Sequence, residues 1–97
     1  MVEIILDGRN MTDRTVAHDF LASELQFPDY YGRNLDALYD LLSTWPEMVA
    51  IILVHGDCLV ENLGKYGNAL LKTLQDAARS NPNINFINSC EKTENNT

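Results

Sequence analysis

The chain has 97 residues, with 14 acidic and 7 basic side chains and a formal net charge of −7 at pH 7. This length predicts a single domain with a modest core, and the negative charge argues against a nucleic-acid partner and in favour of a basic protein partner. No apolar run approaches the roughly 18 residues of a membrane span, and the start lacks the features of a signal peptide, so we expect a cytoplasmic protein without a membrane partner.

The first quarter of the chain predicts a strand and a helix. Residues 2–6 form a short apolar run that ends in an Asp-Gly turn signal, which is typical of a strand. A helix follows, capped by Thr12 or Asp13, with Thr15 as a later alternative, and Pro28 closes it off. We expect its buried stripe to comprise Val16, Ala17, Phe20, Leu21 and Leu25.

Two apolar patterns of different period occupy the middle of the chain. From about Asn34 the leucines recur at helical spacing, which predicts a helix. Its expected core face comprises Leu35, Leu38, Leu42 and Trp45. Residues 49–54 read VAIILV without alternation, which is typical of a parallel strand buried in the middle of a sheet.

The last part of the chain predicts two helices, a strand and a tail. A short helix is expected over about residues 57–63, and a longer one from Gly67 to near Ser80. The longer helix should bury Leu70, Leu71, Leu74 and Ala78. Pro82 then precedes a strand at residues 84–88, and we expect the polar tail 91–97 to be frayed.

The order of these elements predicts an α/β domain with a three-stranded parallel sheet and helical crossovers. Parallel neighbours need long connections, and each pair of strands is separated by two predicted helices. Periodicity does not reveal the strand order. The wholly apolar run at residues 49–54 nevertheless suits a central strand.

One face of the predicted helix at Asn34 is unusually acidic. Asp36 falls in the first turn, where the helix dipole favours a carboxylate. Asp40 falls in mid-helix, where aspartate is a poor helix former and where repulsion by Asp36 costs about 0.2–0.5 kcal/mol. An unfavourable residue on an exposed face indicates a functional site, with a merely solvated polar face as the alternative.

The segment at residues 27–45, FPDYYGRNLDALYDLLSTW, resembles the signature of the barstar family of ribonuclease inhibitors. That signature has two aromatics and a glycine, then Asn-Leu-Asp-Ala-Leu, an aromatic residue and an aspartate, and shortly afterwards a tryptophan. It is met by Tyr30, Tyr31, Gly32, residues 34–38, Tyr39, Asp40 and Trp45. The remaining predicted elements also follow the family's order and spacing.

The resemblance implies one two-layer α/β domain over residues 1–90, with its strands in the order 1-2-3. It also implies a protein that has no catalytic activity, metal or cofactor of its own. Such a protein would bind a basic, secreted-type ribonuclease in a one-to-one complex and block the enzyme's phosphate-binding cleft, and we expect it to be monomeric alone. A family member whose partner is not a ribonuclease is the alternative.

The resemblance assigns roles to individual residues. The carboxylate of Asp40 would accept charge-assisted hydrogen bonds from the enzyme's arginines and catalytic histidine. Tyr30 would cover that histidine, Asp36 would pair with a basic group at the rim, and Tyr39 would supply contact area. Clamping of the loop over the core is the alternative for Tyr30, and it is the role that we expect of Tyr31.

Other candidate contacts are less specific. Asp76 stands where the family has a second acidic contact, although Lys72 and Arg79 could simply pair with it. Trp45 matches a tryptophan near the family's interface, but we expect it to be chiefly a core residue.

Three residues depart from the best-known member of the family. Tyr39 stands in place of a tryptophan, Thr44 in place of a glycine whose backbone approaches the enzyme, and Arg33 in place of an acidic residue. These changes predict a cognate ribonuclease that differs in loop detail.

A small Cys/His enzyme is a remote alternative. His55, Asp57 and Cys58 follow the second strand, where active sites of parallel sheets gather, and a histidine could activate a thiol. No residue is identifiable as orienting His55, however, and we expect His18 to lie at the surface or its boundary. Cys58 and Cys90 lack metal-site spacing and disulfide density, so we expect reduced thiols.

Overall fold

The computed structural model describes residues 2–89, so the predicted tail at 91–97 and Cys90 lie outside the described residues. The elements are β1 (Val2–Asp7), η1 (Gly8–Asn10), α1 (Arg14–Leu25), α2 (Leu35–Ser43), β2 (Val49–Val54), α3 (Gly56–Leu63), α4 (Lys65–Ser80) and β3 (Ile84–Ser89). No helix in this part of the chain is both long enough and apolar enough to span a membrane.

The three strands form one parallel sheet in the order β1-β2-β3, which confirms the predicted architecture. The apolar strand β2 is central, where hydrogen-bonded neighbours on both sides bury it. Each row of side chains across the sheet faces one side only. Ile4, Ile51 and Phe86 share the face packed against the core, whereas Ile5, Ile52 and Ile87 share the other face.

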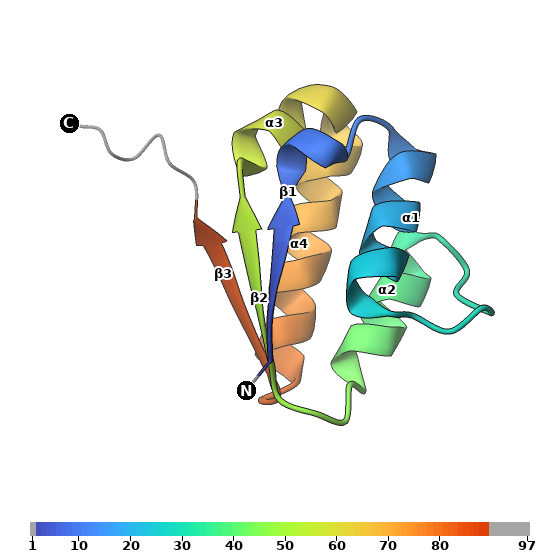
Figure 1. The fold of residues 1–97 in the computed structure, drawn as a ribbon, viewed down its shortest axis with the longest axis vertical. Coiled ribbons are helices and arrows are strands. Elements are labelled where there is room, and N and C mark those ends of the chain that lie inside the picture. The colour runs from blue at the N-terminus through green and yellow to red at the C-terminus, as the bar shows by residue number, and fades with distance from the viewer. Residues whose placement is uncertain (1, 90–97) are drawn as a thin grey trace.

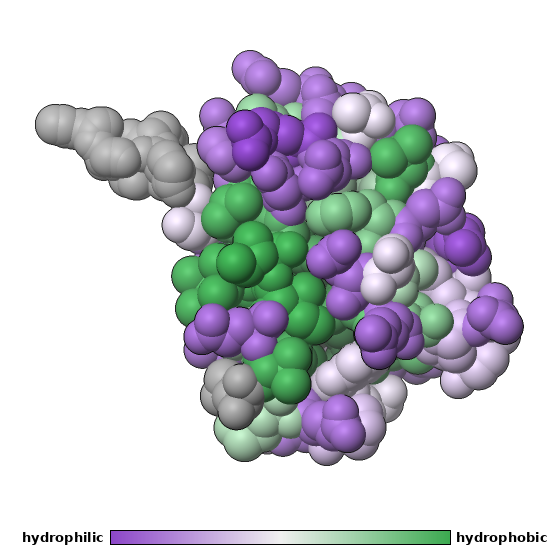
Figure 2. All heavy atoms as spheres, viewed as in Figure 1, coloured by the Kyte–Doolittle hydropathy of each residue, from purple (hydrophilic) through white to green (hydrophobic). Residues whose placement is uncertain are grey.

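The helices make the second layer. Figure 1 shows α1, α2 and α4 on one side of the sheet, and leucines from all three helices join the buried core between the layers. The opposite face of the sheet is open, and Figure 2 shows an apolar patch over the strands there. Ile5 and Ile87, with 57% and 42% of their surface exposed, belong to that face.

Helix α1 buries a different stripe from the predicted one. Asp13 caps the helix, and its carboxylate accepts a hydrogen bond from the backbone N–H of Val16 at 2.9 Å. The buried positions are Ala17, His18, Leu21 and Leu25, whereas Val16 is 39% exposed. The prediction that Val16 is buried was wrong. The buried stripe includes the polar residue His18, which a search for apolar residues at helical spacing does not detect.

Helix α4 begins at Lys65, two residues before the predicted start at Gly67. The role of Gly67 is packing, because a Cβ there would lie 2.9 Å from the carbonyl oxygen of Leu59 and 3.0 Å from the Cα of Val60. Its missing side chain therefore allows α3 and α4 to approach closely.

Candidate partner-binding surface

Helix α2 forms from a strong start signal and an apolar stripe. Asn34 is the N-cap, and its side-chain oxygen accepts a hydrogen bond from the backbone N–H of Ala37 at 2.7 Å. Leu38 and Leu42 are fully buried, and Leu35 packs against the same core. The predicted stripe is therefore confirmed, and it turns the acidic face of α2 outward.

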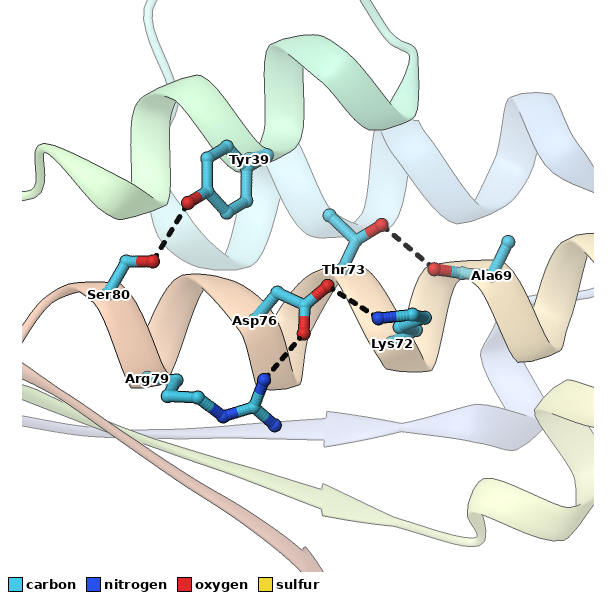
Figure 3. A network of polar contacts seen from close by, with 7 residues as sticks. All are labelled: Tyr39, Ala69, Lys72, Thr73, Asp76, Arg79 and Ser80. Atoms are coloured by element: carbon cyan, nitrogen blue, oxygen red, sulfur yellow. Dashed lines mark hydrogen bonds and ion pairs between the residues drawn. The ribbon is translucent and has the colours of Figure 1, made fainter.

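Asp36 and Asp40 lie on that outward face, and both are exposed. Among the described residues, neither carboxylate takes part in a hydrogen bond or an ion pair, so both negative charges remain available to a partner. Tyr39 lies between them in sequence and is 37% exposed. Its hydroxyl lies 2.8 Å from the Ser80 Oγ, a contact that joins α2 to α4 (Figure 3).

The loop before α2 separates the two neighbouring tyrosines. Tyr31 is buried, with 4% of its surface exposed, and its ring lies 4.7 Å from that of Phe27 between centroids. The prediction that Tyr31 clamps the loop over the core is confirmed. Tyr30 is 81% exposed, which argues against the same role for it. Tyr30 and Asp40 line one open pocket of about 240 Å³, so the structure brings these two predicted site residues together.

The loop is anchored by His18, which the sequence wrongly predicts to lie at the surface or its boundary. His18 is 2% exposed, and its ring nitrogens lie 2.6 Å from the hydroxyl oxygens of Tyr31 and Tyr66. A neutral imidazole offers one donor and one acceptor, so it can satisfy both tyrosines. Burial lowers the pKa of His18, and the nearby positive charges of Arg14 and Arg33 act in the same direction.

Arg33 makes hydrogen bonds within the domain. Its backbone has φ of 54°, in the left-handed region that few residues other than glycine adopt. Its guanidinium donates a hydrogen bond to the carboxylate of Asp19 at 2.8 Å and another to the carbonyl oxygen of Tyr31 at 3.4 Å. Arg33 therefore joins the loop to α1, and its role toward a partner stays a prediction.

Asp76 on α4 has local partners. Its carboxylate accepts hydrogen bonds from Lys72 at 3.0 Å and from Arg79 at 2.9 Å (Figure 3). The hydrogen bond from Lys72 is the main reason that the pKa of Asp76 lies below its usual value, although burial opposes it. The local pairing that we considered for Asp76 is present, and its charge is largely compensated within α4.

The last two predicted contacts follow α2. The Thr44 hydroxyl donates a hydrogen bond to the carbonyl oxygen of Asp40 at 2.8 Å. This carbonyl belongs to the last turn of α2, where backbone carbonyls lack a partner within the helix. Trp45 is partly buried against the core, and its ring meets that of Phe27 edge-on at 5.9 Å. Trp45 thus packs against the core as predicted, while its role toward a partner stays a prediction. It lines a different pocket from Asp40.

The rival site at the end of β2 shows no sign of an activated nucleophile. Burial raises the pKa of the Cys58 thiol, and the charges of Asp57 and Glu61 raise it further. Within residues 2–89 Cys58 is a free cysteine, and the reduced state of both cysteines stays a prediction. Since the thiolate is the reactive form, these surroundings disfavour nucleophilic catalysis.

The comparisons with known proteins agree with the fold and the signature. A family model described as "Barstar (barnase inhibitor)" matches residues 1–89. A protein of Bacillus subtilis (strain 168) named "Putative ribonuclease inhibitor YrdF" is 42% identical over 78 residues, which make up 79% of this chain and 86% of that protein. The chain therefore belongs to the barstar family.

Proposed function

We propose that the protein inhibits a small basic ribonuclease by filling the enzyme's phosphate-binding cleft with Asp40 and the residues around it. The main support is the geometry of Asp40, an exposed carboxylate without a partner among the described residues, in one pocket with the exposed ring of Tyr30. Membership of the barstar family and the name of the Bacillus subtilis relative support the class of target.

The mechanism requires no chemistry from the inhibitor. A carboxylate is planar, charged and only accepts hydrogen bonds, so it can take the place of a phosphate among arginines. Helix α2 holds Asp40 on a packed scaffold, because the buried Leu38 and Leu42 fix the helix against the core. Little conformational freedom is then lost on binding, which favours affinity.

The other predicted contacts would contribute unequally. Asp36 has no hydrogen-bond or ion-pair partner within residues 2–89, and its carboxylate would meet a basic group at the rim of the cleft. Asp76 is already paired with Lys72 and Arg79, so we expect a smaller contribution from it. Tyr39 offers the exposed part of its ring beside Asp40, while its hydroxyl is engaged with Ser80.

The proposal is tested by mixing the purified protein with basic ribonucleases from the same source and measuring RNA cleavage. Stoichiometric loss of activity and a one-to-one complex are expected. The association rate should fall steeply as salt rises, because salt screens the attraction between the acidic face and a basic enzyme. An association rate insensitive to ionic strength would contradict the electrostatic part of the proposal.

A charge-matched control separates local from general electrostatics. Asp36→Asn and Glu3→Gln each remove one negative charge, but Glu3 is exposed on β1, away from α2. Asp36→Asn should slow association more than Glu3→Gln does.

A complex with another protein, without any inhibition of ribonucleases, would favour the alternative of an interaction module. The cytoplasmic location stays a prediction, which fractionation of cells would check.

A further inference from the structure

Three different metal-ligating side chains converge where β2 meets α3. His55 is the N-cap of α3, and Asp57 and Cys58 belong to the first turn of that helix. One imidazole nitrogen, one carboxylate oxygen and the thiol sulfur all lie within 4.8 Å of one another. The inhibitory mechanism proposed above uses none of these residues.

We propose that His55, Asp57 and Cys58 bind a divalent transition-metal ion, for which Zn²⁺ is the best match. Zn²⁺ accepts nitrogen, oxygen and sulfur ligands in a tetrahedral arrangement, at distances of about 2.0–2.3 Å. Neighbouring ligands of such a site are roughly 3.5 Å apart, so rotation of these partly exposed side chains would bring them to the ion. A water molecule would occupy the fourth position.

The chemistry of this donor set selects among metals. A thiolate and an imidazole favour Zn²⁺ and similar ions over Mg²⁺ and Ca²⁺, which prefer sets made wholly of oxygen ligands. One carboxylate and one thiolate also neutralise the two charges of the ion. The Cys58 thiol gives up its proton to the solvent as the bond from sulfur to the metal forms.

The local charges suit a cation. The carboxylates of Asp57 and Glu61 lie close enough to Cys58 to act on it electrostatically, and their negative charges attract a positive ion to this place. Arg9 is the nearby opposing charge, but its guanidinium is occupied by the carboxylate of Asp7 at 2.8 Å. The positive N-terminal end of the α3 dipole repels a bare cation, but it stabilises the thiolate and the carboxylate that bind the ion. The two effects of the dipole on metal binding therefore oppose each other.

The backbone holds the ligands in place. The carbonyl oxygen of His55 accepts a hydrogen bond from the backbone N–H of Cys58 at 3.0 Å, which ties the two residues in one turn. That carbonyl also packs against Gly8, where a Cβ would collide with it. Figure 1 shows α3 beside the carboxyl ends of β1 and β2, away from α2 and its preceding loop. Metal binding should therefore leave the Asp40 surface free.

The expectation that the protein binds no metal came from the family resemblance and from the spacing between Cys58 and Cys90, and the structure does not test it. The structure places a histidine and an aspartate around Cys58. The signal was present in the sequence as His-Gly-Asp-Cys directly after a buried strand. It becomes specific only when the turn into α3 brings the three side chains together.

The test uses the reduced full chain and Co²⁺ as a coloured substitute for Zn²⁺. Binding should produce the intense absorption of a bond between a thiolate and Co²⁺, and Zn²⁺ should abolish it by displacement. Cys58→Ser should remove this absorption, and Asp57→Asn should weaken the binding of Zn²⁺ about tenfold or more. Cys90→Ser is the matched control and should leave both measurements unchanged.

A second readout is the thermal unfolding midpoint, which Zn²⁺ should raise for the unaltered chain and for Asp40→Ala but not for Cys58→Ser. Circular dichroism without metal shows whether each variant is folded, and the exposed Asp57 gives a test if Cys58→Ser fails to fold. The proposal is overturned if no thiolate absorption appears, if Cys90→Ser abolishes it, or if Asp57→Asn binds Zn²⁺ as tightly as the unaltered chain.

Discussion

Replacing Asp40 by alanine should change stability and binding in opposite directions. Asp40 is exposed within α2, and its carboxylate has no hydrogen bond or ion pair within residues 2–89. Alanine removes a repulsion with Asp36 worth about 0.2–0.5 kcal/mol and is the better helix former by up to about 0.7 kcal/mol. The free energy of unfolding should rise by a few tenths up to about 1 kcal/mol, which moves the urea midpoint upward.

Affinity for the ribonuclease should fall in the same variant. The enzyme's arginines would be left buried without a partner, which costs at least about 2–5 kcal/mol of binding free energy. The expectation that one aspartate dominates is inherited from the barstar family, whereas the opposite effect on stability follows from α2 of this chain. Opposed signs are typical of a residue kept for function at the expense of the fold.

Urea unfolding and the dissociation constant should be measured side by side for this variant. Asp36→Ala is the matched control, because it removes the same repulsion together with a carboxylate that the helix dipole favours. It should therefore gain less stability than Asp40→Ala and lose less affinity. If Asp40→Ala instead made the domain less stable and left affinity unchanged, Asp40 would be structural and the proposed mechanism would be wrong.

The remaining predictions concern the core and the loop. Leu38→Ala should lower the free energy of unfolding by about 2–5 kcal/mol through a cavity, whereas Tyr30→Ala should weaken binding and change stability by no more than about 0.5 kcal/mol; urea titrations that show the reverse would place Tyr30 in the core. Burial lowers the pKa of His18, so the unfolded chain takes up the proton first and stability should fall as pH drops below about 6.5, levelling off below the folded-state pKa. His18→Gln should lack that part of the pH dependence of the urea midpoint. An unchanged pH profile would show that His18 is not its cause.

Elements whose signal is local could be predicted from the sequence. The central strand β2 has the bounds expected from its apolar run, because burial on both faces leaves no polar position to blur its ends. The N-cap Asn34 and the stripe of Leu38 and Leu42 likewise carry their own start signal and period. The predicted start of α4 at Gly67 was wrong by two residues. A glycine marks a possible helix boundary in the sequence, whereas Gly67 lies inside α4 and allows its close contact with α3.

Features that depend on distant partners could not be predicted. The burial of His18 rests on Tyr31 and Tyr66, which are 13 and 48 residues away in the sequence. The same limit applies to Tyr39, whose hydroxyl meets Ser80 from another helix. Asp40 could be predicted as a site residue without knowledge of a distant partner. The signal was local, because an aspartate in mid-helix is repelled by Asp36 and no neighbouring basic residue in the sequence offsets that repulsion.

The basic side chains that form ion pairs in the described part of the chain leave the acidic face of α2 uncompensated. Within residues 2–89, four basic side chains form ion pairs, and all of these pairs lie outside α2: Arg9 with Asp7, Arg33 with Asp19, and Lys72 and Arg79 with Asp76. A chain that needed negative charge only for solubility could place it where a cation relieves it. Here Asp36 and Asp40 repel each other on an exposed helix, so α2 carries an uncompensated negative charge, which suits the basic partner proposed above.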